Sequence, residues 1–267
     1  MFLGRPTDYP ERYSPELLCA IPRAEQRRAL ALGEHLPFHG DDLWNAWEIT
    51  WLDPRGKPLV ATGVIRVPAD SPNLIESKSF KLYLNSLSMT RFAATEEVAA
   101  VITGDLSKCA AVEVHVALNP GPATVSGLIH DLPGICIDTL DVECDTRSVD
   151  PSLLNVASDK VVSEALHSHL LRSLCPVTDQ PDLGSILVRY RGPAIDRSSL
   201  LRYVASYRRH NDFHEVCVER IFVDLKERCA PAQLTVYARY NRRGGLDINP
   251  FRSDFETGID NLRLWRQ

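Results

Sequence analysis

The order of the predicted elements indicates an α+β fold made of two ββααββ repeats. Period-two strands and amphipathic helices follow one another in the same order in both halves of the 267-residue chain. A weak sequence similarity between the halves supports the repeat. The spacing from Glu97 to Asp105 in the first half differs by only one residue from the spacing from Glu215 to Asp224 in the second. Such repeats have mostly antiparallel sheets with their helices on one face.

The chain is expected to divide into three segments. Residues 1–40 read as an irregular N-terminal arm with a short helix near Ala24–Leu32. Residues 41–145 form the first predicted module and residues 146–267 the second, and the polar stretch Asp145–Ser158 links them.

The first module opens with a predicted hairpin. Its turn, Asp53–Gly56, has the Asp-Pro-x-Gly chemistry of a tight turn. Two helices and two strands complete the module. The expected ranges are Leu43–Trp51 and Leu59–Val67 for the hairpin, Leu74–Met89 and Thr95–Leu106 for the helices, and Val112–Leu118 and Ile135–Val142 for the last strands.

The second module repeats this order. Ile186, Val188 and Tyr190 alternate with polar or opposite-facing residues, as in a half-buried strand. The expected ranges are Lys160–Arg172 and Ile186–Arg191 for two strands, Arg197–Arg209 and Asp212–Glu227 for two helices, and Leu234–Tyr240 for a further strand.

Composition and charge narrow the class of protein. Hydrophobic residues make up 44% of the chain and charged residues 24%, as in ordinary globular proteins. The net charge is -5, so no nucleic-acid partner is expected. The N-terminus lacks the apolar core of a secretory signal, and no apolar run reaches the ~20 residues of a membrane span. We therefore expect a soluble, cytoplasmic protein without a membrane partner.

Cysteine and histidine spacing predicts neither disulfides nor a metal site. The 7 cysteines are scattered and contain no CxxC pair, which argues against a disulfide framework and a structural zinc site. His167 and His169 share one face of a predicted strand, but no third ligand is evident. No metal is therefore expected.

One cysteine differs from the others in its surroundings. Cys175 lies between two predicted strands, and Pro176 and Pro181 stiffen the loop that joins it to Asp182. A thiolate is a soft nucleophile, and a nearby carboxylic acid can give a proton to the group that the sulfur attacks. The alternative is a buried structural cysteine beside an aspartate that stabilises a turn, which is the commoner role.

Residues 76–83, ESKSFKLY, open a predicted helix. Helix N-termini bind anions through free N–H groups, so Ser77 and Lys78 suit a phosphate. Glu76 does not fit an anion site but suits the paired N–H donors of a guanine-like base. The alternative is a solvated first turn in which Glu76 complements the helix dipole.

Two segments of the second half have both a functional and a structural interpretation. Residues 211–215 place His214 and Glu215 where they can face a ligand, but Asp212 as N-cap with Glu215 at N3 also makes a capping box. Residues 239–245 bring arginines to a Gly-Gly turn, which suits a phosphate, although a charged hairpin tip is commoner.

Together these segments resemble the NADPH-dependent 7-cyano-7-deazaguanine reductase (QueF) family of queuosine biosynthesis. Residues 76–83 match the family signature E-[SL]-K-[SA]-hydrophobic-K-[LY]-[YFW] at every position, and residues 175–182, CPVTDQPD, match its catalytic loop. With the signature in the first half and the cysteine in the second, the chain resembles the long, two-module branch. The resemblance covers roughly residues 44–252.

The resemblance implies a fold that the sequence pattern alone does not name. It is the tunnelling fold (T-fold) shared with GTP cyclohydrolase I, in which units pair through their sheets and bind purine-like ligands at unit interfaces. The long branch of the family has tandem T-fold modules in one chain, and resemblance to it implies a homodimer. The signature and Cys175 would then act together across a module or subunit interface, so that separated halves are inactive.

The resemblance also implies roles for single residues. Cys175 would attack the nitrile of 7-cyano-7-deazaguanine, and Asp182 would protonate its nitrogen, giving a covalent thioimide. Two NADPH would then reduce the thioimide to the amine. Substrate contacts would come from Ile75, Glu76, Ser77, His214 and Glu215, and NADPH contacts from Ser77, Lys78, Arg243 and Gly244, with Arg242 as a further phosphate contact.

Three other functions use parts of the same pattern. A cyclohydrolase-like hydrolase would need zinc ligands whose spacing the sequence lacks. A non-catalytic purine-binding protein would not need the Cys175 and Asp182 pair. A thiol peroxidase-like enzyme would need a resolving cysteine, for which Cys217 and Cys229 are the candidates.

Overall fold

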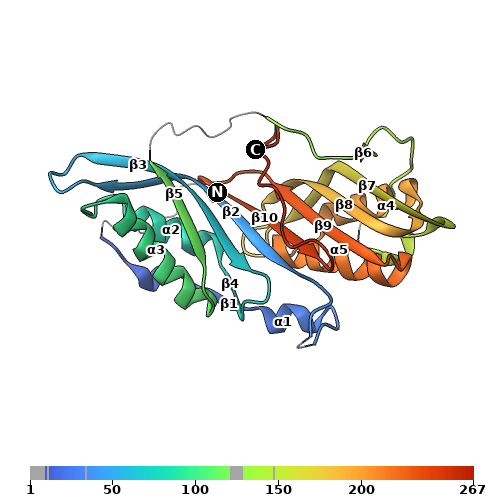
Figure 1. Cartoon of the computed structure of the whole chain (residues 1–267), viewed down its shortest axis with the longest axis horizontal. Helices are drawn as coiled ribbons and strands as arrows, with labels where there is room; N and C mark the ends of the chain where they lie inside the picture. The colour runs from blue at the N-terminus through green and yellow to red at the C-terminus, as the bar shows by residue number, and fades with distance from the viewer. Residues whose placement is uncertain (1–9, 11, 34, 121–128, 147) are drawn as a thin grey trace, which may run out of the picture. The chain divides into compact units, whose positions relative to one another are not determined.

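A computed structural model of the chain describes residues 10, 12–33, 35–120, 129–146 and 148–267 (Figure 1). The chain forms two compact units that are interleaved along the sequence. The predicted segments 1–40, 41–145 and 146–267 stay predictions. The first unit comprises Met1–Arg23, Trp44–Val125 and Arg243–Leu246, and the second comprises Ala24–Leu43, Ser126–Arg242 and Asp247–Gln267.

The first unit combines a sheet with two helices. Its strands follow the order β5-β3-β2, and β3 and β5 are antiparallel. A separate antiparallel pair joins β1 to β4 immediately before α2. The bounds are η1 Pro15–Leu17, β1 Ala20–Pro22, β2 His39–Leu52, β3 Pro58–Pro68, β4 Asn73–Ile75, α2 Ser77–Ser86, α3 Thr95–Ala110 and β5 His115–Pro120, with the first residues of β2 belonging to the second unit.

Apolar side chains of the helices and strands form the core of the first unit. In α3, Val98, Ile102 and Leu106 recur every four residues, so all three lie on one buried face. The rings of Trp44 and Phe80 meet edge to face with centroids 5.4 Å apart, a favourable aromatic geometry. The predicted helices of this unit are therefore present and amphipathic.

The second unit contains an antiparallel sheet in which the long strands β7 and β8 pair with each other. The order is β10-β9-β8-β7, with a short β6 parallel to β7. No described helix is long and apolar enough to cross a membrane. The bounds are α1 Arg23–Arg28, β6 Ile135–Cys136, η2 Pro151–Leu153, β7 Val156–Leu174, β8 Pro181–Ile195, α4 Arg197–Ser206, η3 Tyr207–Arg209, α5 His214–Cys229, β9 Gln233–Tyr240 and β10 Leu246–Ser253.

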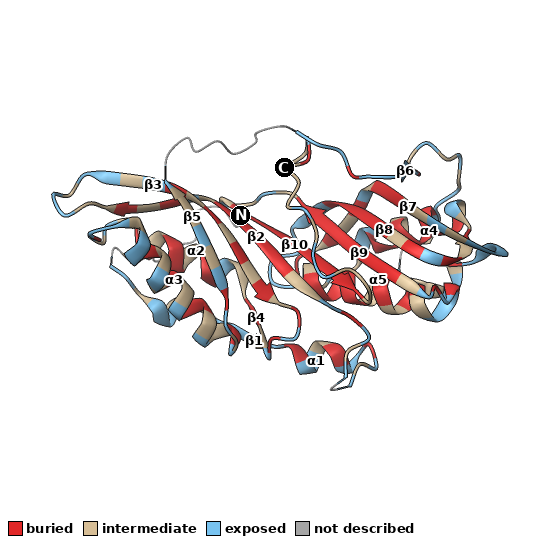
Figure 2. Cartoon of the chain, viewed as in Figure 1, coloured by how far each residue is buried: buried red, intermediate tan, exposed pale blue. Residues whose placement is uncertain are grey.

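Alternation along β8 gives the second unit a core on each face of its sheet. Ile186 and Val188 belong to the cluster that includes the buried residues of α4 and α5. Leu187 belongs to the other cluster, with Tyr237 of β9 and Phe251 of β10. Figure 2 shows β9 and β10 as almost continuously buried strands.

The mixed α+β class and the antiparallel sheets agree with the prediction, but one predicted strand is shorter, and β1, β4 and β10 lie outside the predicted strand ranges. Only Ile135–Cys136 of the predicted Ile135–Val142 strand is paired, and the pairing is parallel. Beyond it, Asp138 Oδ2 accepts the His169 N–H at 2.9 Å, so a side chain replaces a strand carbonyl. Strand β10 was not predicted, because buried polar residues interrupt its apolar alternation.

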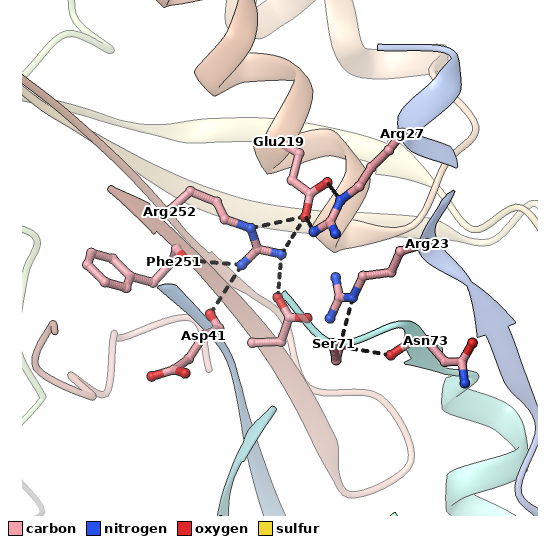
Figure 3. A network of polar contacts seen from close by, with 9 residues as sticks. Arg23, Arg27, Asp41, Ser71, Asn73, Glu219, Phe251 and Arg252 are labelled. Atoms are coloured by element: carbon pink, nitrogen blue, oxygen red, sulfur yellow. Dashed lines mark hydrogen bonds and ion pairs between the residues drawn. The ribbon is translucent and has the colours of Figure 1, made fainter. Parts of the chain in front are cut away.

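A buried ion network stabilises the second unit (Figure 3). The guanidinium of Arg252, on β10, lies 2.9 Å from Glu219 Oε1 and 2.8 Å from Asp42 Oδ1. Glu219, on α5, also accepts two hydrogen bonds from Arg27, at 2.9 and 2.7 Å. Burial disfavours the charged guanidinium, but Asp42 and Glu219 outweigh this and raise the pKa of Arg252. The network therefore fixes the N-terminal segment, helix α5 and β10 within one unit.

Candidate active site

Cys175 lies on the loop that joins β7 to β8. Strand pairing places Leu174 opposite Pro181 and Ser173 opposite Asp182, so the loop of residues 175–180 closes a hairpin. Cys175 N donates to Gln180 O at 2.9 Å, and Asp179 N donates to Cys175 O at 2.9 Å. The Cys175 side chain is only 8% exposed, although the rest of the loop is exposed.

The segment that precedes α5 holds this loop from the side. Leu174 N donates to His210 O at 2.7 Å, and Asp212 N donates to Leu174 O at 3.1 Å. Asn211 Nδ2 donates to Asp179 Oδ1 at 2.6 Å, which supports the left-handed backbone of Asp179 at φ +55. The start of α5 is therefore fixed beside the Cys175 loop.

Asp182 meets His214 at the start of α5. Asp182 Oδ2 lies 3.0 Å from His214 Nε2, and the Asp182 residue is 2% exposed. The His214 ring stacks on Tyr240 with centroids 3.8 Å apart and an interplanar angle of 7°. Burial, with a smaller effect of Cys217, raises the pKa of Tyr240 well above its usual value, so this ring stays neutral. The contact therefore brings a carboxylate and an imidazole together next to the Cys175 loop.

Glu215 occupies the first turn of α5 and is 3% exposed. The predicted capping box is wrong, because the N-cap is Phe213 and its side chain makes no cap hydrogen bond. Asp212 Oδ1 instead accepts the neighbouring Phe213 N–H at 2.9 Å. Glu215 is thus a buried carboxylate near the positive end of a helix dipole, where negative charge is stabilised.

The predicted signature residues lie at the start of α2 in the first unit. Glu76 is the N-cap, and its carboxylate accepts from Lys78 N at 2.8 Å and from Ser79 N at 2.6 Å. The structural interpretation of Glu76 as a helix-terminal carboxylate is therefore correct in part. Ile75 is buried at the end of β4, Ser77 is half-buried, and Lys78 is exposed.

Arg243 and Gly244 form a tight turn that also belongs to the first unit. Arg243 N donates to Leu246 O at 2.9 Å. Gly244 has φ +58, and a Cβ added there would lie 3.1 Å from Lys81 Cδ, so only glycine fits without displacing the lysine. The exposed Arg242 precedes this turn. The turn thus lies against α2, which carries Ser77 and Lys78 on its first turn.

The predicted site residues fall into two groups. The first unit holds those at the start of α2 and in the glycine turn, and the second unit holds those on the β7–β8 hairpin and at the start of α5. In the first group are Ile75, Glu76, Ser77, Lys78, Arg243 and Gly244, and in the second are Cys175, Asp182, His214 and Glu215.

The two candidate resolving cysteines, Cys217 and Cys229, are buried. All 7 cysteines are free. Cys217 is 0% and Cys229 1% exposed, and burial raises the pKa of Cys217 well above its usual value and that of Cys229 to about 11. Because the thiolate is the reactive form, both thiols are poor partners for a peroxidase-like exchange at neutral pH.

Sequence reasoning missed two features of the second unit. It did not find Tyr240 beneath His214, since stacking between a strand and a helix leaves no sequence pattern. It also found no third residue near His167 and His169, whereas the structure places Cys136 beside them. Cys136 lies beside the two histidines because β6 pairs with β7, and no local sequence pattern predicts this pairing.

Comparisons with known proteins identify the family of the chain. A family profile described as the N-terminal part of 7-cyano-7-deazaguanine reductase, a nitrile reductase, matches residues 9–118, and one described as QueF-like protein matches residues 181–258. Asp182, His214 and Glu215 lie within the second range, and Cys175 lies shortly before it. A curated relative from Dechloromonas aromatica (strain RCB), named NADPH-dependent 7-cyano-7-deazaguanine reductase, is 52% identical over 267 residues.

That alignment covers 99% of this chain and 94% of the relative. A solved structure, the archaeosine synthase QueF-Like in the apo form, is 19% identical. The match covers 36% of this chain and 95% of the solved chain, with a TM-score of 0.32.

Proposed function

Because the chain belongs to the NADPH-dependent 7-cyano-7-deazaguanine reductase family, we propose that it reduces the nitrile of 7-cyano-7-deazaguanine to a primary amine. The product would be 7-aminomethyl-7-deazaguanine, an intermediate of the queuosine tRNA modification. The observation that carries the proposal is the β7–β8 hairpin, which presents a nucleophile, Cys175, and an acid, Asp182, on one rigid element.

The first step is addition of the Cys175 thiolate to the nitrile carbon. The C–S bond forms as one π bond of the nitrile breaks, and the electron pair moves to nitrogen. Asp182 gives that nitrogen a proton, so the product is a neutral thioimide attached to Cys175. His214, 3.0 Å from Asp182, can return a proton to the carboxylate afterwards.

NADPH, when bound, supplies hydride to the carbon in two successive reductions. Between them, the C–S bond breaks and its electron pair leaves with Cys175 as the thiolate. A second proton, taken up by nitrogen from solvent, completes the amine. The first unit fits a phosphate-bearing cofactor, because Lys78 and Arg243 supply positive charge and Gly244 leaves the backbone open where a Cβ would meet Lys81. Ser77 adds a hydroxyl at the same helix start, and Arg242 is a further candidate for a phosphate contact.

Recognition of the base is assigned to carboxylates at two helix starts. Glu76 and Glu215 each suit the N–H groups of a guanine-like edge, because ionised carboxylates accept two parallel hydrogen bonds. His214 beside Glu215, and Ile75 and Ser77 beside Glu76, complete the proposed contacts.

The proposed assembly is a cytoplasmic homodimer of chains with tandem T-fold modules. The second unit supports this, since its elements run β7, β8, α4, α5, β9, β10 in the ββααββ order. All cysteines are free, which fits a reducing compartment. Sedimentation equilibrium should give about 60 kDa, twice the 29.9 kDa of one chain, whereas a single 29.9 kDa species would refute the dimer.

The test of the reaction is its stoichiometry. We expect 7-cyano-7-deazaguanine to cause oxidation of two NADPH for each amine formed, measured by absorbance and by mass spectrometry of the product. A Cys175→Ala variant should show neither, and a Cys144→Ala variant, which changes an exposed cysteine, should behave as wild type. A Cys175→Ala variant that still forms the amine would contradict the proposal.

A further inference from the structure

The second unit contains a cluster of metal-ligand side chains that the nitrile chemistry does not use. Cys136, His167 and His169 each offer one ligand atom, and these atoms all lie within 4.8 Å of one another. Thiolate and imidazole are the ligands that Zn²⁺ prefers in proteins.

The backbone builds this cluster from two strands. His167 and His169 are two residues apart on β7, so both side chains point to one face of the sheet. Cys136 is the register partner of His167 in the parallel β6–β7 pair. Gly134, at φ +91, lets the incoming segment approach β7, because a Cβ there would lie 2.1 Å from Ala165 O. The approach therefore requires a glycine.

Hydrogen bonds at the far ring nitrogens orient both histidines. His167 Nδ1 lies 3.2 Å from Pro133 O, and since a carbonyl only accepts, Nδ1 carries the proton and Nε2 has a free lone pair. His167 is 4% exposed, and its buried Nε2 has no hydrogen-bond partner among the described residues. His169 Nδ1 lies 2.8 Å from the buried Ser185 Oγ. Such outer partners are typical of metal-binding histidines.

A fourth ligand is available beside the two imidazoles. Asp131 Oδ1 lies 3.1 Å from His169 Nε2 and 4.0 Å from His167 Nε2. Its side chain is 65% exposed, so it can turn toward a shared ion without leaving a buried position. The Ser185 hydroxyl can donate to or accept from His169 Nδ1, so it can serve either tautomer of that ring.

We propose that Cys136, His167 and His169, with Asp131 as the fourth ligand, bind one Zn²⁺ in a tetrahedral site. Zinc bonds of ~2.0–2.3 Å set ligand separations of roughly 3.3–3.6 Å, so the cluster closes by about 1 Å on binding. The thiol releases its proton to solvent, and no electron transfer is involved. The ion would tie the segment around β6 to β7.

This site is separate from the reacting cysteine. His169 and Cys175 lie at different points along the same stretch of β7 and its loop, on the order of 15–20 Å apart at ~3.3 Å per residue. The proposal is therefore independent of the nitrile reductase function, and the proposed role of the bound ion is structural.

Cobalt substitution tests the site directly. The full chain is treated with a chelator, desalted and titrated with Co²⁺ under reducing conditions. We expect one Co²⁺ per chain, a thiolate-to-metal charge-transfer band, visible bands of tetrahedral intensity, and loss of all bands when one equivalent of Zn²⁺ is added. Cys136→Ser should remove the charge-transfer band and weaken binding at least tenfold.

Matched variants test whether the charge-transfer band comes from Cys136 or from another cysteine. Cys144→Ser and Cys175→Ala should keep the band, because neither residue belongs to the cluster. Circular dichroism checks that each variant is folded, and Cys136 is exposed, so its replacement by serine should be tolerated. The proposal is overturned if folded wild type takes up no Co²⁺ or Zn²⁺, if the band survives in Cys136→Ser, or if it is lost in Cys175→Ala.

Discussion

The contact between Asp182 and His214 gives the candidate acid a proton source. Asp182 is 2% exposed, and its Oδ2 lies 3.0 Å from Nε2 of the His214 imidazole. Tyr240 stacks on the opposite side of the imidazole and fixes its plane. A carboxyl group in this position can protonate a nitrile nitrogen and be reprotonated without direct access to solvent.

We predict that Asp182→Asn lowers kcat of NADPH oxidation by roughly 10²–10⁴, the usual contribution of a positioned general acid. The amide keeps the size of the side chain but cannot give up a proton. Asp179→Asn, on the same loop, is the matched control, because asparagine tolerates the left-handed conformation at φ +55. A kcat in Asp182→Asn within threefold of wild type would remove Asp182 from the mechanism.

At this scale the sequence predicts that Cys175 and Asp182 lie on one hairpin, but it does not predict the residues around them. Cys175 and Asp182 sit in one short, proline-flanked segment, and the hairpin register fixes them once both strands are recognised. His214 reaches Asp182 only through the packing of α5 against the sheet, which the sequence does not specify. Asp212 was wrongly expected to cap α5, because its carboxylate bonds to the adjacent N–H instead.

In α2, the observed helix cap and the proposed contact with the base fall on one side chain, Glu76. Glu76 accepts the N–H groups of Lys78 and Ser79, which would otherwise lack partners at the helix start. Each carboxylate oxygen can accept more than one hydrogen bond, so the cap leaves capacity for a ligand.

We predict that Glu76→Gln raises KM for 7-cyano-7-deazaguanine about tenfold or more, since a charge-assisted hydrogen bond contributes about 1.5–3 kcal/mol. Glu76→Ala should also lower the free energy of unfolding by about 1 kcal/mol, because the cap is lost. Substrate titrations and urea unfolding measure the two effects. Glu96→Ala, an exposed residue in the first turn of α3, is the control. An unchanged KM in both Glu76 variants would leave Glu76 a cap only.

Helices α4 and α5 share a buried hydroxyl network that responds to alkaline pH. Tyr203 donates to Asp224 Oδ2 at 2.5 Å and lies 2.8 Å from the Tyr207 hydroxyl. Burial is the main cause that raises the pKa of both tyrosines well above 10.0. The folded state therefore keeps protons that the unfolded state loses above pH 10.0, so this contribution is full below that pH and is lost as pH rises.

The free energy of unfolding should accordingly fall between about pH 9 and pH 11. Denaturant titrations at several pH values measure this fall. It should be smaller in Tyr207→Phe, which removes one buried phenol. An identical pH dependence in wild type and Tyr207→Phe would show that Tyr207 does not contribute.

The elements themselves were largely predictable, and the exceptions have physical causes. Strands β2, β3, β8 and β9 and helices α2 to α5 follow clear periodicities. Strand β10 does not, because Asp247, Asn249 and Arg252 are buried with polar partners inside the unit. The order of strands and the parallel approach of β6 depend on contacts between distant segments, which alternation does not encode.

At the scale of the whole molecule, Arg252 joins three segments that are far apart in the sequence. It contacts Asp42 near the N-terminal segment and Glu219 on α5, and Glu219 also pairs with Arg27. Each member has its charge compensated, and removing one would leave buried charges without that compensation.

We predict that Arg252→Met lowers the free energy of unfolding by about 3–5 kcal/mol, the usual cost of breaking a buried ion network from one side. Urea unfolding followed by circular dichroism measures the change. Arg202→Met, an exposed position on α4, should change it by about 0.5 kcal/mol or less. Equal stability of the two variants would mean that the network contributes little.

The most direct test of the account is adduct formation without NADPH. Purified protein is mixed with 7-cyano-7-deazaguanine, and its intact mass and absorbance spectrum are recorded. We predict a mass increase equal to one substrate, with a new absorption band, in wild type and Cys144→Ala but not in Cys175→Ala. If wild type binds the base yet gains no mass, or if the adduct persists in Cys175→Ala, the covalent mechanism through Cys175 is contradicted.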